Sequence, residues 1–301
     1  MRPVLIAGPT ASGKSGLALR IAERDGGRVI NADALQVYEC WRVLTARPTD
    51  RDLSRAPHAL YGHVSCDTRY SVGHWLRETR REIEDARRCG ERPVIVGGTG
   101  LYFSALTRGL SEIPEVPAEV RARADEMLRA EGLAAMVDSL GALDPVTVRR
   151  TDIANPARVR RAWEVVTATG RGLAAWHETA GAPVIAEETC FPVVMDADKD
   201  NLNSWIRQRF SRMIEDGALE ECRENLRSDR DAASPSMRAI GAPELTAHLR
   251  GEISLDAASE AACVATRQYA KRQRTWFRNR MAGWRRIDPE DGDPLDAVPV
   301  D

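Results

Sequence analysis

Close to the N-terminus stands the stretch Gly8-Pro9-Thr10-Ala11-Ser12-Gly13-Lys14-Ser15, which decides the fold. It fits the pattern G-x-x-x-x-G-K-[ST] at every fixed position. A short apolar run over residues 4–7 precedes it, and a helical pattern over residues 13–24 follows. In such a strand–loop–helix setting, backbone N–H groups, the helix N-terminus and the Lys14 ammonium surround an oxyanion. The stretch therefore predicts a phosphate- or pyrophosphate-binding loop, called the P-loop below, without saying which molecule carries the phosphate.

Further apolar runs bounded by turns predict buried strands at residues 28–31, 93–96 and 191–195. Helical patterns occupy the stretches between them at residues 72–88 and 101–108. Strands that alternate with helices indicate a parallel sheet covered on both faces. The expected fold class is α/β, a P-loop NTPase-like parallel sheet flanked by helices, with ligands at the carboxyl ends of the strands.

The pattern of alternating strands and helices ends after residue 109. Residues 113–117 read Ile-Pro-Glu-Val-Pro, which is typical of a linker, and the pattern is then helical to about residue 180. We therefore expect an all-helical insertion domain over residues 113–183, inside a core formed by residues 1–112 and 184–287. Residues 288–301 are acidic and Pro-rich, and we expect this tail to be frayed.

Composition narrows the class of protein. The chain has 301 residues, of which 43% are hydrophobic, enough for a large buried core. Its net charge of −2 means that any basic surface must be local. The six cysteines are scattered without a C-x-x-C pair, so we expect free thiols in a reducing cytosol rather than a metal site or disulfides. The sequence offers neither a signal peptide nor a long apolar segment, so we expect a cytoplasmic protein without a membrane partner.

Asp33 follows the second expected strand and therefore lies at the same rim of the sheet as the P-loop. A carboxylate there could accept a proton from a bound group or hold Mg²⁺, or it could only cap the next turn. Position alone leaves these readings open. Residues 97–100, Gly-Gly-Thr-Gly, make a second close approach of the backbone to this rim. That strand does not end in a Walker-B Asp, which argues mildly against ordinary ATP hydrolysis.

Arg209 borders an apolar stripe on a helix expected at residues 201–216. Ile206, Phe210 and Met213 define the stripe at helical spacing. The Arg209 guanidinium could point into a cleft and clamp a phosphate. A solvated side chain with a buried stem is the competing interpretation.

Basic side chains form a stripe on a helix expected at residues 255–281, spaced four, three and four apart: Arg267, Lys271, Arg274 and Arg278. No Asp or Glu occurs from residue 261 to 286, so neutralisation within that stretch of the helix is not available. This favours a phosphate backbone over a merely solvated charged face. Arginines at positions 121, 123, 158, 160 and 161 add basic groups to the insertion, which suggests that it grips a long anion.

Taken in order along the chain, these motifs resemble the tRNA dimethylallyltransferases, isopentenyltransferases that modify the adenosine next to the anticodon. The resemblance runs from residue 4 to about residue 278. Besides the P-loop it rests on the segments Asn31-Ala32-Asp33, Gln36-Val37-Tyr38, Gly97-Gly98-Thr99-Gly100-Leu101-Tyr102, Arg158, Arg161-Ala162, Arg209, Met213, Gly217, Arg238-Ala239-Ile240-Gly241, Ala265-Thr266-Arg267-Gln268, Lys271-Arg272-Gln273 and Trp276.

The resemblance implies a reaction. The P-loop would hold the pyrophosphate of dimethylallyl diphosphate rather than ATP, with Mg²⁺ near Ser15, and Asp33 would act as general base on adenine N6. N6 would then attack C1 of the dimethylallyl group as pyrophosphate leaves. The implied catalytic residues are Asp33, Thr10 and Arg209. The implied pyrophosphate-binding residues are Gly8, Thr10, Ala11, Ser12, Gly13, Lys14, Ser15 and Arg209.

The resemblance also implies a monomer that binds the anticodon stem-loop of tRNA, through shape, phosphates and splayed bases. The target adenine has to leave its stack to react. With the basic stripe included, the expected tRNA-binding residues are Asp33, Ala34, Leu35, Gln36, Thr99, Arg123, Ala157, Arg158, Val159, Arg160, Arg161, Arg238, Gly241, Arg267, Lys271, Arg274 and Arg278.

The sequence departs from the family pattern at two places. Leu44 stands where the family commonly has Gly, and Ala242-Pro243 stand where it commonly has Tyr followed by Lys or Arg. The second change removes an aromatic ring and a cation from an expected tRNA-contact loop. Prenyl transfer to a free adenine nucleotide therefore remains an alternative acceptor reaction. A P-loop small-molecule kinase is a further alternative, against which the missing Walker-B Asp argues. A non-catalytic RNA-binding protein is another, against which the intact P-loop argues.

Overall fold

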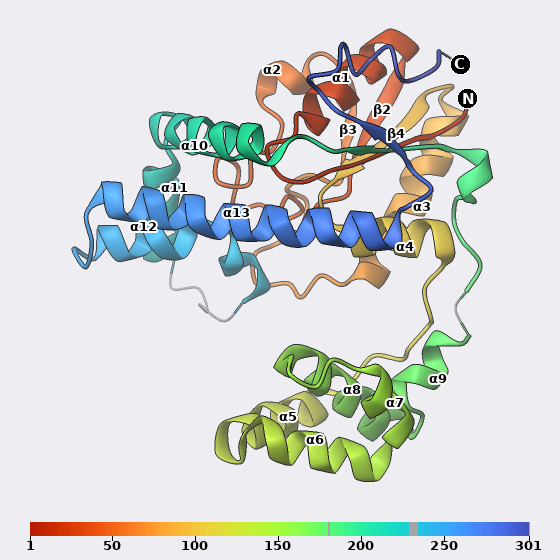
Figure 1. The fold of residues 1–301 in the computed structure, drawn as a ribbon, viewed down its shortest axis with the longest axis vertical. Helices are drawn as coiled ribbons and strands as arrows, with labels where there is room; N and C mark the ends of the chain where they lie inside the picture. The colour runs from red at the N-terminus through yellow and green to blue at the C-terminus, as the bar shows by residue number, and fades with distance from the viewer. Residues whose placement is uncertain (180, 229–233, 301) are drawn as a thin grey trace. The chain divides into compact units, whose positions relative to one another are not determined.

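The computed structural model describes residues 1–179, 181–228 and 234–300. The chain forms two compact units, one made of Met1–Thr107 with Ile185–Asp301 and the other of Arg108–Val184. The insertion expected at residues 113–183 lies within the second unit. Figure 1 draws this second unit in yellow to green, after the orange N-terminal part of the first.

The first unit is built on a six-stranded sheet in the order β3-β2-β4-β1-β5-β6, in which neighbouring strands run parallel (Figure 1). The strands are β1 (Val4–Ala7), β2 (Gly27–Asn31), β3 (His58–Ala59), β4 (Arg92–Gly97), β5 (Phe191–Met195) and β6 (Arg285–Ile287). The parallel α/β fold predicted from the sequence is confirmed. The short edge strands β3 and β6 were not predicted.

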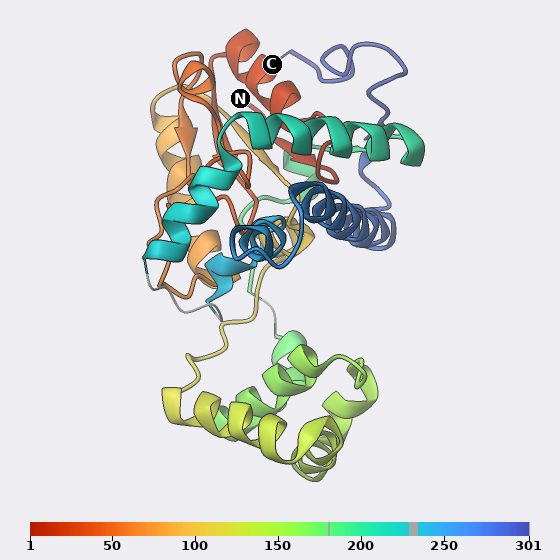
Figure 2. The ribbon, with the colours of Figure 1, turned by 90° about the vertical axis from the view of Figure 1, so that its left-hand side faces the viewer.

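Helices α1 (Lys14–Asp25) and α3 (Val72–Arg88) pack directly against this sheet. The unit also contains α2 (Asp50–Leu53), α4 (Gly100–Arg108), α10 (Lys199–Glu215), α11 (Ala218–Arg227), α12 (Ala242–Leu249) and α13 (Leu255–Arg280), with short 3₁₀ turns η1 (Glu187–Thr189) and η2 (Pro235–Arg238). Of these, α11 and α12 pack against each other and against α10 and α13, respectively. Helices α10 and α13 lie side by side in both ribbon views (Figures 1 and 2). Among the described residues, no helix is long and apolar enough to cross a membrane.

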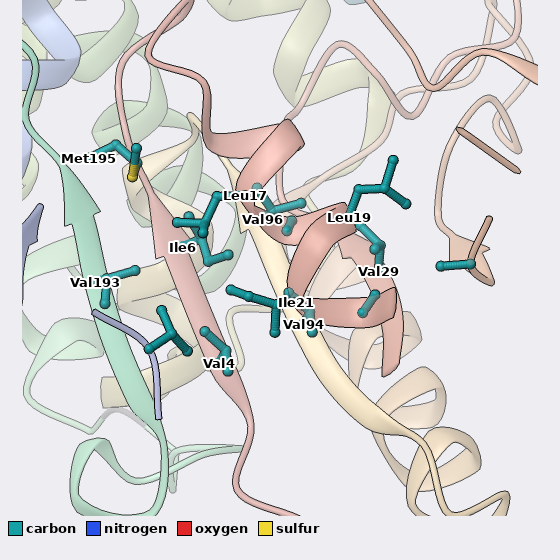
Figure 3. Packing of buried hydrophobic residues seen from close by; sticks show 14 of the residues in the cluster. Val4, Ile6, Leu17, Leu19, Ile21, Val29, Val94, Val96, Val193 and Met195 are labelled. Atoms are coloured by element: carbon teal, nitrogen blue, oxygen red, sulfur yellow. The ribbon is translucent and has the colours of Figure 1, made fainter. Parts of the chain in front are cut away.

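Helix α1 is held on the sheet by its apolar face. Leu17 and Ile21 of α1 are buried against Val4 and Ile6 of β1 and against Val94 of β4 (Figure 3). Burying side chains of this size stabilises a fold by about 1.5–3 kcal/mol each. The packing fixes the start of α1, and therefore the P-loop, relative to the ends of β1 and β4.

Among the described residues of the second unit, every regular element is a helix. It contains α5 (Ala118–Ala130), α6 (Gly132–Leu143), α7 (Pro145–Arg150), α8 (Pro156–Thr169) and α9 (Leu173–His177). Met136, Leu140 and Trp163 are buried in its own apolar core. Helix α8 begins where the Asn155 side chain accepts from the backbone N–H groups of Ala157 and Arg158, so a side-chain cap defines this helix end.

The acidic tail is not frayed, contrary to expectation. Val298 is 2% exposed and packs into the same core as α1, and Asp293 forms an ion pair with Arg20 of α1 at 2.5 Å. The guanidinium of Arg24 donates to Val298 O at 3.0 Å. Composition suggested a solvated segment, but an apolar anchor and arginines on α1 hold the tail in place.

The expectation that all cysteines are free thiols is wrong for one pair. Cys40 and Cys66 form a disulfide, with their Cα atoms 6.0 Å apart. The chain turns back beyond β3 and pairs residues 37–39 with residue 64: Val64 N donates to Val37 O at 3.0 Å, and Glu39 N donates to Val64 O at 2.9 Å. This backbone pairing brings together two cysteines whose sequence spacing matches no motif.

Candidate active site

A cavity of about 440 Å³ opens in the first unit beside the P-loop, at the carboxyl ends of β1 and β2. The P-loop, the turn after β2, the segment 44–46, and helices α10 and α13 all contribute to its wall. Its lining residues include Thr10, Ala11, Ser12, Gly13, Lys14, Ser15, Asp33, Leu35, Gln36, Leu44, Arg209, Phe210, Met213, Ile240 and Tyr269. All the P-loop positions from Thr10 to Ser15 and both proposed catalytic partners, Asp33 and Arg209, therefore share one cavity.

The P-loop has the geometry of an anion cradle. Gly13 precedes α1 with φ at 80°, a left-handed conformation that glycine adopts without strain, and Lys14 is the first residue of the helix. The buried Ser12 hydroxyl has no hydrogen-bond partner among the described residues, which suits a site that takes up a polar ligand. The Lys14 ammonium donates to Pro9 O at 3.1 Å and so folds back over the loop.

Helix α10 brings a cation to the P-loop. The Arg209 guanidinium donates to the Thr10 hydroxyl at 3.0 Å. Its neighbours Ile206, Phe210 and Met213 are buried in the apolar cluster, which orients the helix so that Arg209 points into the cavity. Burial lowers the pKa of Arg209, and Asp33 opposes that shift. The Arg209 guanidinium therefore points into the cavity, and its contact with a phosphate stays a prediction.

Asp33 is fixed by the turn that follows β2. The Asn31 side chain accepts from Asp33 N at 2.9 Å, and Asp33 Oδ1 accepts from Leu35 N at 3.0 Å. The neighbouring Ala34 N donates to the Thr99 hydroxyl at 3.0 Å, which joins this turn to the loop after β4. Asp33 thus caps its turn with one oxygen and also lines the cavity, so the two descriptions of this carboxylate are not exclusive.

Gln273 of α13, to which the sequence assigned no role, joins two loops of the site. Its side-chain oxygen accepts from Thr10 N at 2.9 Å, and its amide nitrogen donates to Gly98 O at 2.9 Å. A Cβ at Gly98 would lie 2.2 Å from that nitrogen, so a larger residue there would displace the Gln273 amide. Gln273 is 5% exposed and thereby couples the P-loop, the loop after β4 and α13.

Replacing this glutamine should loosen the P-loop. Gln273→Ala leaves the buried Gly98 carbonyl without its partner, at about 1–3 kcal/mol, and frees the half-buried Thr10 N–H at a smaller cost. We expect a lower denaturation midpoint together with weaker binding of the dimethylallyl diphosphate that the resemblance implies, measured by urea titration and by calorimetry. Gln273→Glu is the matched control, because its carboxylate still accepts from Thr10 N but cannot donate to Gly98 O. It should retain part of the affinity. Equal losses in both variants would contradict a role for the Thr10 contact.

The pKa of Lys14 is lowered to about 8, first by burial and then by the nearby Arg209, while Asp33 partly opposes the shift. The ammonium is charged below that pH and becomes neutral above it. A bound anion favours the charged form, so binding of a diphosphate should take up a proton once the pH exceeds about 8.

This pKa predicts how donor affinity depends on pH. The affinity for a diphosphate, such as the donor that the resemblance implies, should fall by up to about tenfold per pH unit above pH 8, because the free protein then loses the Lys14 charge. Calorimetry at pH 7 and pH 9.5, in buffers of different ionisation enthalpy, measures both the affinity and the proton uptake. Lys14→Arg should bind without the decline, since guanidinium stays charged. A flat profile in the unsubstituted protein would show that Lys14 does not lose its charge in this range.

The basic stripe of α13 is partly neutralised, which corrects the inference drawn from the sequence. Arg267 pairs at 2.8 Å with Glu260, just before the acid-free stretch, and Arg274 lies 3.8 Å from Asp196, which follows β5. Lys271 and Arg278 are exposed. Seven residues, about two helical turns, separate these two side chains, so they lie on the same face of α13. Together they form the accessible part of the stripe.

The expected tRNA-binding residues of the second unit lie on its surface with one exception. Val159 is fully buried in the core of this unit, so its side chain cannot contact a ligand at the surface. Arg158 and Arg161 are exposed, and Arg160 pairs with Asp125 at 2.5 Å. Arg123 lies 5.7 Å from the centre of the Trp163 ring, a cation–π contact. In the first unit, Arg238 is exposed, whereas Gly241 is buried.

Comparisons with known proteins place the chain among similar sequences. The model of the IPP transferase family matches residues 36–280, and the isopentenyl transferase model matches residues 1–59. A tRNA dimethylallyltransferase of Dinoroseobacter shibae is 61% identical over 288 residues, which are 96% of this chain and 95% of that protein. A tRNA dimethylallyltransferase of Cereibacter sphaeroides is 59% identical, over 95% of this chain and 96% of that protein.

Solved structures are similar as well. The tRNA isopentenylpyrophosphate transferase of Bacillus halodurans has a TM-score of 0.67 and 29% identity, over 98% of this chain and 92% of that one. A eukaryotic dimethylallyltransferase, solved acting on tRNA, has the same fold, with a TM-score of 0.82 and 23% identity over 98% of this chain and 74% of that one. Because the family model covers most of the sequence and the bacterial relatives match along nearly their whole length, this chain belongs to the IPP transferase family.

Proposed function

We propose that this protein transfers a dimethylallyl group from dimethylallyl diphosphate to N6 of the adenosine next to the anticodon of tRNA. The observation that carries the proposal is the shared cavity, in which Asp33 faces the same space as the P-loop and Arg209. A base for the acceptor and a binding site for a diphosphate leaving group are the two parts that the reaction needs. The names of the bacterial relatives support the same reaction.

The chemistry balances without an external oxidant or reductant. The lone pair of adenine N6 forms a bond to C1 of the donor, the bond from C1 to the diphosphate oxygen breaks, and pyrophosphate leaves with that electron pair. Asp33 takes the proton from N6. Arg209, the Thr10 hydroxyl and the P-loop N–H groups lie where the leaving group gains charge, and such preorganised donors lower the barrier.

Mg²⁺ is the cation that we propose for this site. Ser15 lies in the first turn of α1, exposed to the cavity, and a hydroxyl beside a diphosphate suits a metal held mainly by substrate oxygens and water. Among the described residues no cluster of acidic or histidine side chains would hold a metal by itself. When bound, the ion would neutralise charge on the diphosphate.

The acceptor is tested directly with labelled dimethylallyl diphosphate and Mg²⁺. One reaction contains unmodified tRNA with adenosine after the anticodon, and another contains AMP, ADP and ATP. Label in tRNA alone is the expected result. Label in the mononucleotides alone would mean that the prenyl chemistry is right and the acceptor wrong. Transfer of the ATP γ-phosphate without any prenyl transfer would contradict the proposal and show that the protein is a kinase.

We propose that tRNA binding draws on the exposed cations of α13. Lys271→Ala combined with Arg278→Ala should weaken tRNA binding and reduce the slope of log affinity against log salt by about 1.5–2, from two lost phosphate contacts. Filter binding between 50 and 200 mM salt, roughly the range over which such slopes are read, measures this. Arg267→Ala, which removes a cation already paired with Glu260, should change the slope less. An unchanged slope in the double variant would mean that these cations are only solvated and do not contact tRNA phosphates.

A further inference from the structure

Cys66 lies at a junction of three segments of the first unit. Its sulfur is bonded to Cys40, in the segment that follows β2. Its carbonyl oxygen accepts from the Ser236 hydroxyl of η2 at 2.8 Å, and Ser236 O in turn accepts from Trp41 Nε1 at 2.8 Å. Cys66, Trp41 and Ser236 are each 1% exposed or less. The disulfide is therefore one of three links that join these segments in the interior of the unit.

Two of the linked segments carry residues that are expected to bind tRNA. The segment 36–46 begins and ends at the cavity, because Gln36 and residues 44–46 line it, and Cys40 lies between these ends. Arg238 is the exposed last residue of η2, two positions after Ser236. The disulfide thus joins the segment that carries Gln36 to the junction that holds η2 and, with it, Arg238.

The sulfur atoms differ in access. Cys40 is half-buried whereas Cys66 is 1% exposed, so a small thiol or disulfide reaches the Cys40 sulfur first. On the proposed function, the protein works where small thiols keep most cysteines reduced. Disulfides are rare in such a compartment, and those that form there are usually transient and sense the redox state. The place of this disulfide therefore favours a reversible bond over a permanent one.

The segments stay paired without the disulfide. Val64 N donates to Val37 O at 3.0 Å, and Glu39 N donates to Val64 O at 2.9 Å. Val37 and Val64 are also buried in one small apolar cluster. None of these contacts involves a sulfur atom, so the two thiols should remain close together after reduction. A pair that stays close can form the disulfide again.

The other four cysteines are less suited to this chemistry. Three of them are buried and free: Cys190, Cys222 and Cys263. Burial raises the pKa of Cys263 and raises the pKa of Cys190 and Cys222 to about 12. These thiols stay protonated near neutral pH, and a thiol reacts as its thiolate. Cys89, at the end of α3, is exposed and free, and it can serve as a control.

We propose that Cys40 and Cys66 form a reversible redox site, which a small disulfide such as glutathione disulfide oxidises and which strengthens tRNA binding when it is oxidised. The inference rests on the proposed function, because tRNA is the acceptor of that reaction. The Cys40 thiolate attacks the small disulfide and releases one thiol. The Cys66 thiolate then attacks Cys40 Sγ and releases the second. The pair gives up two electrons, and its two protons end on the two released thiols.

The expected effect on tRNA follows from order in the free protein. The closed disulfide restrains the segments that carry Gln36 and Arg238 before tRNA arrives. A segment that is already ordered loses less conformational freedom on binding, so a cross-link raises affinity without adding a contact. The P-loop and Arg209 take no part in the junction. The affinity for dimethylallyl diphosphate should therefore be the same in both redox states.

Thiol alkylation and mass spectrometry test the exchange in mixtures of glutathione and glutathione disulfide. The Cys40–Cys66 pair should become oxidised as the share of the disulfide rises, and should return to two thiols when glutathione is restored. Filter binding without donor should give a tRNA Kd about three- to tenfold lower for the oxidised protein. Calorimetry should give equal Kd values for dimethylallyl diphosphate. A pair that stays reduced in every mixture, a pair that glutathione cannot reduce, or equal tRNA affinity would overturn the proposal.

Three variants assign the effect to this pair. Cys40→Ser and Cys66→Ala should each bind tRNA like the reduced protein and no longer respond to glutathione disulfide. Cys40→Ser changes a half-buried side chain and remains informative if the Cys66 variant does not fold. Cys89→Ser is the matched control, because it removes an exposed thiol outside the junction, and it should keep the full response. Loss of the response in Cys89→Ser alone would place it at Cys89, and the proposal would fail.

The redox test and the acceptor test fail independently. Transfer to tRNA by a protein that binds tRNA equally in both redox states would leave the proposed function standing and remove this inference. Redox-dependent tRNA binding without any transfer to adenine would do the reverse.

Discussion

Asp33→Asn should lower turnover of dimethylallyl transfer by about 10²–10⁴-fold, the usual contribution of a general base. The substitution is informative because it isolates the charge. The amide oxygen of Asn can still accept from Leu35 N, as Asp33 Oδ1 does at 3.0 Å, so the turn after β2 keeps its shape. What is lost is the carboxylate that takes the proton from N6.

Single-turnover kinetics with saturating donor and tRNA measure this effect. Affinity for tRNA, measured separately, should change little, because one residue of a large interface is altered without loss of shape. Asp33→Ala, which removes the cap as well, should be at least as slow and less stable. Near-normal turnover of the Asn variant would remove Asp33 from the proton transfer.

Arg209→Ala should lower kcat by about 10²–10³-fold, the effect seen when one preorganised donor to a developing charge is removed. The guanidinium donates to the Thr10 hydroxyl at 3.0 Å and is half-buried in the cavity wall. Charge developing on the leaving group would interact with it more strongly than in bulk solvent. Arg209→Lys should recover only part of the rate, since an ammonium lacks the forked geometry.

Arg207→Ala is the matched control for this prediction. Arg207 belongs to the same helix but does not line the cavity, and its ion pair with Glu260 is 3.5 Å long between exposed side chains. Such surface pairs contribute little to stability. Steady-state kinetics should therefore give an unchanged kcat. If both variants lose the same activity, the effect belongs to α10 as a whole rather than to the charge at the P-loop.

The central sheet could be predicted from sequence because its strands are short apolar runs that follow one another between helices. Edge strands β3 and β6 gave no such signal. β3 has two residues, and β6 reads Arg-Arg-Ile with both arginines exposed. Each exists because a neighbouring strand offers its backbone for pairing, which is a tertiary effect.

The P-loop and Asp33 could be predicted for a different reason. The P-loop is a contiguous motif, and Asp33 could be placed beside it from strand order alone. Gln273 could not, since its partners Thr10 and Gly98 are more than 170 residues away in sequence.

The structure differs from the sequence-based expectation at Val159 and in the C-terminal tail, and both differences have physical causes. Val159 was expected at a surface because it stands among arginines, yet it shares a helix face with the buried residues Ala162, Trp163 and Val166 at spacings of three, four and seven. That spacing was readable in the sequence. Composition predicts a frayed tail because it takes no account of a single apolar anchor, Val298, or of Arg24 on α1, which donates to Val298 O.

The most direct test of the whole account locates the transferred group. Unmodified tRNA is incubated with the protein, Mg²⁺ and labelled dimethylallyl diphosphate, then digested and mapped by mass spectrometry, while released pyrophosphate is counted. The account predicts one N6-dimethylallyl adenosine per tRNA, immediately after the anticodon, with one pyrophosphate for each transfer. Prenylation at another nucleotide, or pyrophosphate release without any modified adenosine, would contradict it.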